Sequence, residues 1–264
     1  MTDGDKIPGI IHPTAIVAEN VTIAENVSIG PFCVIEDDVD IGANTSIGGH
    51  TIIRQYSRIG KNCRIFSHNS IGEIPQDLKF SGEKSLLEIG DNTTVREFCT
   101  LNRGTEESGK TLIGKNVLLM AYVHAAHDCV IGDHSILANG VQLGGHVKIG
   151  EHVIIGGMTP VHQFCKIGDH TMIGGGFRVV QDVPPYALAG GEPLKFSGLN
   201  AIGLRRRGFS PDIRKQIKQA YNLVYNSGFN KKQALSKLHE QFNPASIEIQ
   251  NIINFLENSE RGLV

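Results

Sequence analysis

Large aliphatic residues stand at every sixth position over most of the chain, from Ile11 to Val179. The register holds throughout, and only Asp77, Glu83, Glu107 and Ala125 replace the aliphatic residue. A period of six residues fits neither an α-helix nor a simple alternating strand. It is typical of short parallel strands wound into a solenoid, and it therefore predicts a hexapeptide β-helix.

A smaller residue stands four positions after each aliphatic residue. All five cysteines occupy this slot: Cys33, Cys63, Cys99, Cys129 and Cys165. We expect buried free thiols, because unpaired cysteine is among the most buried residue types. Cysteines thirty or more positions apart in one slot lie in different coils, too far apart for a disulfide. Their odd number and the lack of a disulfide framework favour a reduced, intracellular protein.

Two segments interrupt the ladder without changing its phase, residues 73–88 and residues 103–111. Both are rich in charge and contain glycine, which is typical of loops. We expect them to project from a corner of the solenoid. Loops on a rigid scaffold are usual places for binding residues.

The periodicity becomes helical after the ladder ends. Ser210-Pro211 predicts a helix start, with serine as the cap and proline in the first turn. Asn230 predicts a second start, and Asn243-Pro244 a third. We therefore predict a β-helix over residues 1–191 and a small α-helical domain over residues 192–264.

Composition narrows the function further. The formal net charge is −2, which does not indicate general affinity for nucleic acid. No apolar run is long enough to span a membrane. The first residues, Met1 to Lys6, are polar and lack the apolar core of a secretion signal. These features predict a cytoplasmic protein.

Several histidines fall where neighbouring coils should meet, because residues eighteen apart stack one coil above another. One such column contains His127, Gly145 and Gln163, and the column beside it contains Asp128, His146 and Phe164. His162 directly precedes Gln163 in the sequence, and His124 lies half a side of the coil away from His127. Since neighbouring strands are ~4.8 Å apart, the three histidines 127, 146 and 162 should crowd within about 10 Å. This gathering indicates a functional site.

Two chemistries compete for these histidines. Some hexapeptide solenoids are zinc-dependent carbonic anhydrases with an H-x-x-x-x-H pair, but no two histidines here are five apart. The one H-x-x-H pair, His124 and His127, has no obvious acidic third ligand. The other chemistry is acyl transfer, in which a histidine acts as general base for a hydroxyl nucleophile. Gly145 would let a substrate approach its backbone N–H closely and stabilise an oxyanion. The pattern favours acyl transfer without a metal and leaves metal binding as the alternative.

The run His124–Cys129 resembles the H-x-A-H-D segment of the acyltransferases that begin lipid A synthesis. Further segments agree with that family in the same order along the chain: residues 12–15, 71–73, 76–79, 103–105, 161–164, 181–186 and 203–209. The resemblance covers essentially the whole chain, and the order of loops and the R-R-G-F segment are not shared by hexapeptide proteins at large. Proteins with such repeats are left-handed parallel β-helices with three six-residue sides per turn, which we expect here.

The resemblance also implies an activity. It is transfer of a fatty acyl group, of the 3-hydroxy kind, from acyl carrier protein to the glucosamine 3-hydroxyl of UDP-N-acetylglucosamine. His127 would be the general base, Asp128 would orient or charge it, and the backbone of Gly145 would hold the oxyanion. No cofactor and no metal are implied.

The family pattern further implies a set of substrate-binding residues: Gln76, Asp77, Lys79, His124, His146, His162, Gln163, Asn200, Arg206 and Arg207. Arginine forks suit the diphosphate. Gly175 matches the position that limits acyl length, and it shares the repeat slot of His127 on another side of its own coil. A site containing both would need a neighbouring subunit, in agreement with the homotrimer that the family forms.

The chain departs from the family at two positions. Asn102 stands where many members have histidine, and Ile202 replaces an acidic residue. Both could alter acceptor binding, and a 3-amino sugar that would yield an amide stays open as the acceptor. A purely structural solenoid is the remaining alternative, but it would need neither the loops nor the histidine edge.

Overall fold

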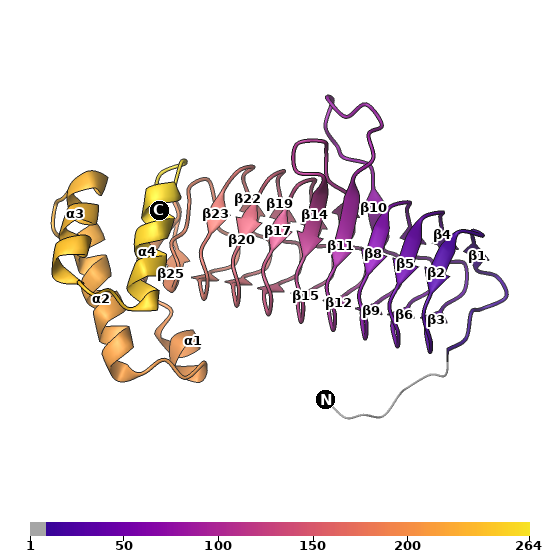
Figure 1. Ribbon diagram of the computed structural model, residues 1–264, viewed down its shortest axis with the longest axis horizontal. Coiled ribbons are helices and arrows are strands. Elements are labelled where there is room, and N and C mark those ends of the chain that lie inside the picture. The colour runs from indigo at the N-terminus through magenta and orange to yellow at the C-terminus, as the bar shows by residue number, and fades with distance from the viewer. Residues whose placement is uncertain (1–8) are drawn as a thin grey trace.

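The computed structural model describes residues 9–264, and they form a three-sided parallel β-helix followed by four α-helices (Figure 1). From β1 to β24, each strand pairs with the third strand before and after it within its sheet, so that consecutive repeats lie on three different sheets. Partners in the register are one coil apart, as in Ile35 with Ile53. This confirms the parallel β-helix expected from the six-residue period.

The strands have the following bounds. The first sheet contains β1 (Ile16–Val17), β4 (Val34–Ile35), β7 (Ile52–Ile53), β10 (Ser70–Glu73), β13 (Thr100–Asn102), β16 (His124–Ala125), β19 (Gln142–Leu143) and β22 (Pro160–Val161). The second sheet contains β2 (Val21–Ile23), β5 (Val39–Ile41), β8 (Ser57–Ile59), β11 (Leu86–Ile89), β14 (Lys110–Ile113), β17 (Val130–Ile131), β20 (Lys148–Ile149) and β23 (Lys166–Ile167). The third sheet contains β3 (Ser28–Ile29), β6 (Ser46–Ile47), β9 (Arg64–Ile65), β12 (Thr94–Val95), β15 (Leu118–Leu119), β18 (Ile136–Leu137), β21 (Ile154–Ile155), β24 (Met172–Ile173), β25 (Ala187–Gly190) and β26 (Lys195–Leu199).

The interior of the solenoid is the aliphatic ladder itself. Ladder residues such as Ile35, Leu101 and Ile131 are buried and stack on ladder residues of the next coil. Ala125, the smallest member, is also fully buried. All five cysteines are free and buried, which confirms their predicted place in the interior.

The three corners of each coil follow one rule, which matters for the site. The second residue of most corners has a left-handed backbone conformation; Asp128 (φ 60°), His146 (φ 61°) and Phe164 (φ 65°) are examples. Asparagine, aspartate and histidine tolerate this region better than other side chains. We call the corner between the first and second sheets the first corner, that between the second and third sheets the second corner, and that between the third and first sheets the third corner.

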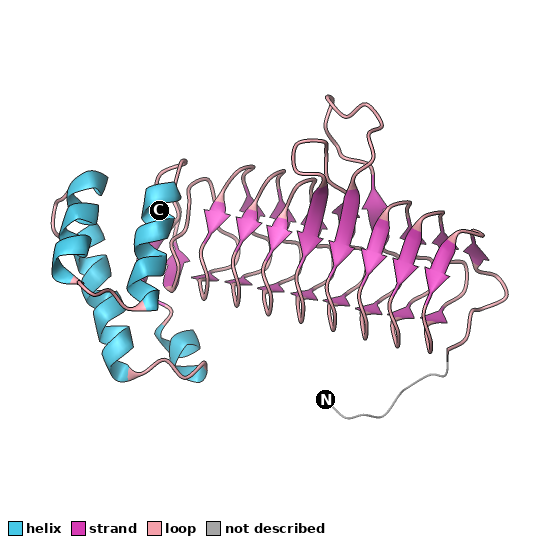
Figure 2. Cartoon of the chain, in the orientation of Figure 1, coloured by secondary structure: helices cyan, strands magenta, loops and turns pink. Residues whose placement is uncertain are grey.

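Both interruptions of the ladder are loops at the first corner. The first loop connects β10 with β11, and the second loop connects β13 with β14. Figure 2 shows the two loops projecting side by side from one edge of the solenoid. Regular pairing resumes on either side, since β11 pairs with both β8 and β14. The phase of the ladder therefore survives the insertions.

The C-terminal helices are α1 (Ala201–Arg206), α2 (Pro211–Tyr225), α3 (Lys231–Gln241) and α4 (Ile247–Asn258). The predicted caps Ser210 and Asn230 are confirmed. The predicted start at Asn243-Pro244 is wrong, because Ser246 caps α4 by accepting a hydrogen bond from the Ile249 N–H.

The helices pack around a second cluster of buried residues that includes Leu204, Ile217, Leu238 and Ile253. Before them, β26 pairs antiparallel with β25 and extends the third sheet to Leu199. The helices thus begin at Ala201, and the division of the chain after residue 191 stays a prediction. Within residues 9–264, every helix is too short or too polar to cross a lipid bilayer.

Candidate active site

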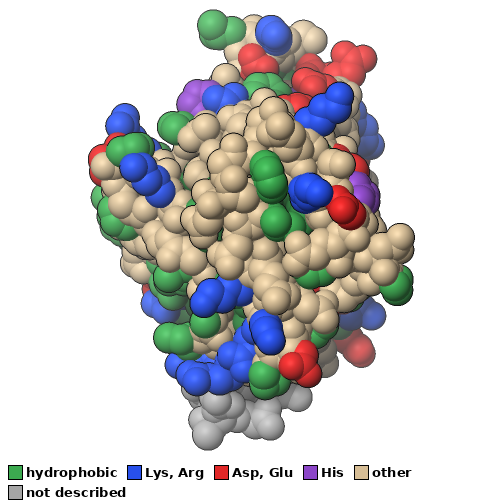
Figure 3. Space-filling view, turned by 90° about the vertical axis from the view of Figure 1, so that its left-hand side faces the viewer, with side chains coloured by type: hydrophobic (Ala, Val, Ile, Leu, Met, Phe, Trp, Pro, Cys, Tyr) green, Lys and Arg blue, Asp and Glu red, His purple; other side chains and the backbone are tan. Residues whose placement is uncertain are grey.

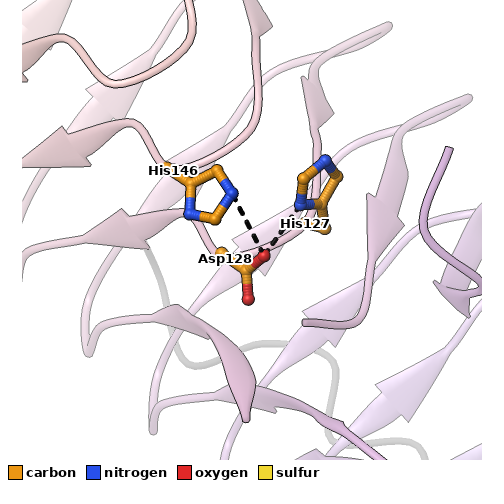
Figure 4. A group of neighbouring side chains, drawn as sticks. All are labelled: His127, Asp128 and His146. Atoms are coloured by element: carbon orange, nitrogen blue, oxygen red, sulfur yellow. Dashed lines mark hydrogen bonds and ion pairs between the residues drawn. The ribbon is translucent and has the colours of Figure 1, made fainter. Parts of the chain in front are cut away.

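His127 and Asp128 form a hydrogen-bonded pair at the first corner, directly after β16 (Figure 4). The Nδ1 atom of His127 lies 2.8 Å from the Oδ2 atom of Asp128. The Asp128 side chain is fully buried, whereas the imidazole keeps 13 % of its surface exposed. A carboxylate on Nδ1 fixes the tautomer that leaves Nε2 free to accept a proton.

The second loop encloses the carboxylate of Asp128. Oδ1 accepts hydrogen bonds from the Thr105 N–H at 2.8 Å and from the Ser108 hydroxyl, and Oδ2 accepts one from the Thr105 hydroxyl at 2.8 Å. Burial raises the pKa of this carboxyl group, but the hydrogen bonds from Ser108, His127 and Thr105 outweigh it and bring the pKa below its usual value. Asp128 is therefore a carboxylate in the neutral pH range.

Gly145 lies against the imidazole of His127 from the next coil. A Cβ atom at Gly145 would lie 2.7 Å from both Cε1 and Nε2 of that ring. The absence of a side chain thus leaves the backbone of Gly145 beside the nitrogen that is free to act as a base. Gly145 is the first residue of its corner, and its N–H donates none of the backbone hydrogen bonds found in residues 9–264.

His146 completes the group. Its Nε2 lies 3.6 Å from Oδ2 of Asp128, and its ring is perpendicular to that of His127 with 5.1 Å between centroids. Phe164, one coil further, stacks on His146 at 4.5 Å. The predicted neighbourhood of His127, Asp128, Gly145 and His146 is therefore present in the folded chain.

The other predicted histidines lie on the same edge. His124, in β16, accepts or donates a hydrogen bond with the Thr100 hydroxyl at 2.7 Å, and burial lowers its pKa. It is thus a neutral ring near His127. His162 contacts the carbonyl of Gln163 at 3.0 Å through Nδ1, and both are exposed one coil beyond Gly145.

A metal site at this corner must be weighed, because His127, Asp128 and His146 could each offer a ligand atom within 4.8 Å of the others. This trio differs from the His124–His127 pair considered from the sequence, and it does contain an acidic residue. However, Asp128 already accepts hydrogen bonds from four donors. A carboxylate has about four acceptor positions, so a metal would have to displace the second loop or His127. The donor set does not fit a resident metal ion.

The remaining predicted residues lie on other elements than His127. Gln76, Asp77 and Lys79 lie on the first loop, where Asp77 accepts a hydrogen bond from the Lys79 N–H at 3.0 Å. Gly175 lies at the third corner, where its closest neighbour is the backbone of Gly157.

Asn200 caps α1, because its Oδ1 accepts a hydrogen bond from the Gly203 N–H at 3.1 Å while its Nδ2 donates to the His170 carbonyl at 2.9 Å. Arg207 donates to the His152 carbonyl at 3.0 Å, and Arg206 is exposed. Figure 3 looks onto the helical end, where Lys and Arg side chains gather toward the lower edge. In Figure 1, α1 lies at the lower part of the same helical end.

Thr105 and Ser108 were not identified as site residues from the sequence. The sequence offered two signals for this loop: it replaces the corner one coil before Asp128, and residues 103–105 match the family pattern. The direction in which the loop folds depends on tertiary contacts, so the spacing of residues could not reveal it.

The β-helix and the His–Asp pair beside a glycine define an acyltransferase of the hexapeptide-repeat class. The model of bacterial transferase hexapeptide repeats matches residues 20–55 and 110–145, and a model described as UDP-N-acetylglucosamine O-acyltransferase, domain 2, matches residues 182–264. The acyl-[acyl-carrier-protein]–UDP-N-acetylglucosamine O-acyltransferase of Thiobacillus denitrificans is 46 % identical over 96 % of this chain and 98 % of its own length.

Solved structures agree with these matches. The UDP-N-acetylglucosamine acyltransferase of Bacteroides fragilis superposes with a TM-score of 0.94 at 47 % identity, covering 97 % of this chain and 100 % of that one. The Arabidopsis enzyme superposes with a TM-score of 0.78 at 35 % identity, covering 96 % and 99 %. The chain belongs to the family of acyl-[acyl-carrier-protein]–UDP-N-acetylglucosamine O-acyltransferases.

Proposed function

We propose that this enzyme transfers a 3-hydroxy fatty acyl group from acyl carrier protein to the glucosamine 3-hydroxyl of UDP-N-acetylglucosamine, the first step of lipid A synthesis. The names of its relatives support the donor and the acceptor. One observation carries the chemistry: Nδ1 of His127 is bound to a buried carboxylate while Nε2 lies beside the backbone of Gly145.

In the proposed reaction, Nε2 of His127 accepts the proton of the sugar hydroxyl as its oxygen attacks the thioester carbonyl. The negative charge that develops on the carbonyl oxygen is stabilised by the Gly145 N–H. The intermediate then expels the pantetheine thiolate, which takes the proton from the imidazolium and leaves as a thiol. The Asp128 carboxylate stabilises the imidazolium between the two steps.

The proposal includes a homotrimer and a left-handed coil in a cytoplasmic enzyme. His127 stands at the first corner and Gly175 at the third, so one chain cannot place both against one acyl group. The third corner carries an exposed stack of rings: Phe32, His50, His68, Phe98 and Tyr122. Aromatic side chains are enriched at protein interfaces, which supports contact of this corner with a neighbouring subunit. Beyond Tyr122 the same column carries Gly140, Met158 and Gly176, and the sulfur of Met158 lies over Gly140.

The two departures from the family pattern, Asn102 and Ile202, bear on the identity of the acceptor. Asn102 is buried and donates from Nδ2 to the Ile74 carbonyl, so it joins the end of β13 to the first loop. Ile202 is exposed on α1. Neither position offers a charged partner to the acceptor, and an analogue with a 3-amino group is the second candidate.

Mass spectrometry of the products tests the proposal. UDP-N-acetylglucosamine and its 3-amino analogue would each be incubated with a mixed pool of acyl carrier protein thioesters. We expect one O-acyl product from the natural sugar, and loss of about 10²–10⁴-fold in rate for His127→Ala. His239→Ala is a matched control, since His239 is exposed on α3. Preferential amide formation would instead assign the amino sugar as the acceptor.

A further inference from the structure

We propose that Thr105 and Ser108 are positioning residues for catalysis: the second loop holds Asp128 in the one orientation and ionisation state in which it can serve His127. This inference rests on the proposed acyl transfer, because it concerns the same general base. It assigns a function to a loop whose hydroxyl groups reach no predicted substrate residue.

The direction of the hydrogen bonds supports this role. The Thr105 oxygen accepts from the Glu107 N–H at 3.3 Å, which leaves its own proton for Asp128. The Ser108 oxygen lies near both the Lys110 carbonyl and Asp128, but a hydroxyl has only one proton. The charged carboxylate is the stronger acceptor. Both hydroxyl groups therefore donate to Asp128.

Other corner carboxylates show that the coil itself does not need this enclosure. Asp91, Asp133 and Asp169 each accept one backbone N–H from the preceding coil, at 2.7 to 2.8 Å, and stay partly exposed. Asp128 has no exposed side-chain surface and gains three donors from an inserted loop. Among residues 9–264 the other buried carboxylate is Asp182, which the C-terminal segment covers through the Ser259 hydroxyl and the Glu260 N–H; of the two, Asp128 is the one that binds a histidine.

Contacts at its base brace the second loop. At its base the guanidinium of Arg103 lies between two rings, 5.0 Å from the centroid of Tyr56 and 5.4 Å from that of Phe80. The loop pairs with the first residue of β11 through hydrogen bonds between Gly104 N–H and the Leu86 carbonyl and between Leu86 N–H and the Gly109 carbonyl. The hydroxyl groups of Thr105 and Ser108 are therefore held by a braced backbone.

The charged groups around Asp128 set the expected effect of pH. His127 and His146 face the carboxylate, and Glu107 lies 3.7 Å from His146. If the two hydroxyl groups are removed, burial remains and raises the pKa of Asp128. The carboxylate then becomes protonated at a higher pH than in the wild type. The acidic limb of the kcat/KM profile should consequently move to higher pH.

The test uses Thr105→Val, Ser108→Ala and the double variant, with Thr105→Ser and Ser108→Thr as conservative controls. We expect each removal to lower kcat by about tenfold, since hydrogen bonds to charged groups are the stronger ones. The KM for UDP-N-acetylglucosamine should stay within about twofold of wild type, since these bonds act on the base and not on ground-state binding. The conservative variants should restore both kcat and the acidic limb. A rise in KM with an unchanged kcat and pH profile would overturn the proposal.

A double-mutant cycle with Asp128→Asn makes the test specific, because a residue that acts through Asp128 has no further effect once that carboxylate is gone. An additive loss would overturn the proposal. NMR of ¹⁵N-histidine-labelled protein provides a readout without turnover: the Nδ1 proton signal of His127 should shift or broaden in the double variant. If wild-type enzyme lacks the proposed acyl transfer but this signal responds, the function fails and the positioning stands. If the enzyme is active and the signal is unchanged, the positioning fails.

Discussion

Replacing Gly145 by alanine is the sharpest test of the site's geometry. The new Cβ atom would lie 2.7 Å from Cε1 and Nε2 of His127, whereas ordinary contact begins at 3.4 Å. The imidazole must therefore move by about 0.7 Å, and it cannot do so freely because its Nδ1 is bound to Asp128 at 2.8 Å. Misplacement of a catalytic group by about 1 Å can cost 10²-fold. We expect kcat to fall by about this factor.

The fold should tolerate the change. Gly145 has no positive φ angle. Exchange of glycine for alanine at a compatible position stabilises the fold by about 0.4–1 kcal/mol, because it reduces the conformational entropy of the unfolded chain. The free energy of unfolding should therefore change little. Gly157→Ala is a matched control for stability, since Gly157 holds the same repeat slot at the third corner and its Cβ would lie 3.1 Å from the Asn139 carbonyl oxygen.

Steady-state acyl transfer and thermal unfolding would be measured on three variants: Gly145→Ala, His127→Ala and the double variant that carries both changes. Because the alanine acts on the imidazole, it should add nothing once His127 is absent. Turnover of Gly145→Ala within about threefold of wild type would refute the reasoning, since a displaced base cannot retain that rate. The substrate would then not use the face of His127 that adjoins Gly145.

Three further predictions follow from the described contacts. Native protein should resist thiol reagents, because burial raises the pKa of Cys129 to about 12; rapid labelling without unfolding would contradict its interior position. Arg206→Ala should raise the KM for the nucleotide sugar more than it lowers kcat, while Arg207→Ala should also lower the melting temperature, because Arg207 donates to the His152 carbonyl. Gly175→Met should shift donor preference to a chain several carbons shorter in a competition between acyl donors; an unchanged preference would place the limit on acyl length elsewhere.

The solenoid could be predicted from sequence because each ladder residue faces the same interior. A period of six gives the sides, and a period of eighteen gives the stacking of coils, which was enough to bring His127, Gly145 and His146 together. The same argument placed the cysteines in the interior. Long-range order in this fold is a simple repeat of local order, so spacing alone carries much of the three-dimensional information.

Elements outside the repeat were less accessible. Ser246, not Asn243, caps α4, and the side chain of Asn200 is engaged at both ends as a cap of α1. The loop that covers Asp128 begins 25 residues before it. Its position depends on contacts of Arg103 with rings from two other segments, and no periodic pattern encodes such contacts.

The site combines two ways of placing a side chain. The regular stacking puts the base on one coil and the backbone of Gly145 on the next, and the strand spacing keeps that distance without help from flexible groups. A regular corner, however, leaves its carboxylate partly exposed, as at Asp133. At Asp128 the inserted second loop buries the carboxylate and satisfies its oxygens. The interruption of the repeat at residues 103–111 is therefore what converts a structural corner into one that can hold a charged partner for His127.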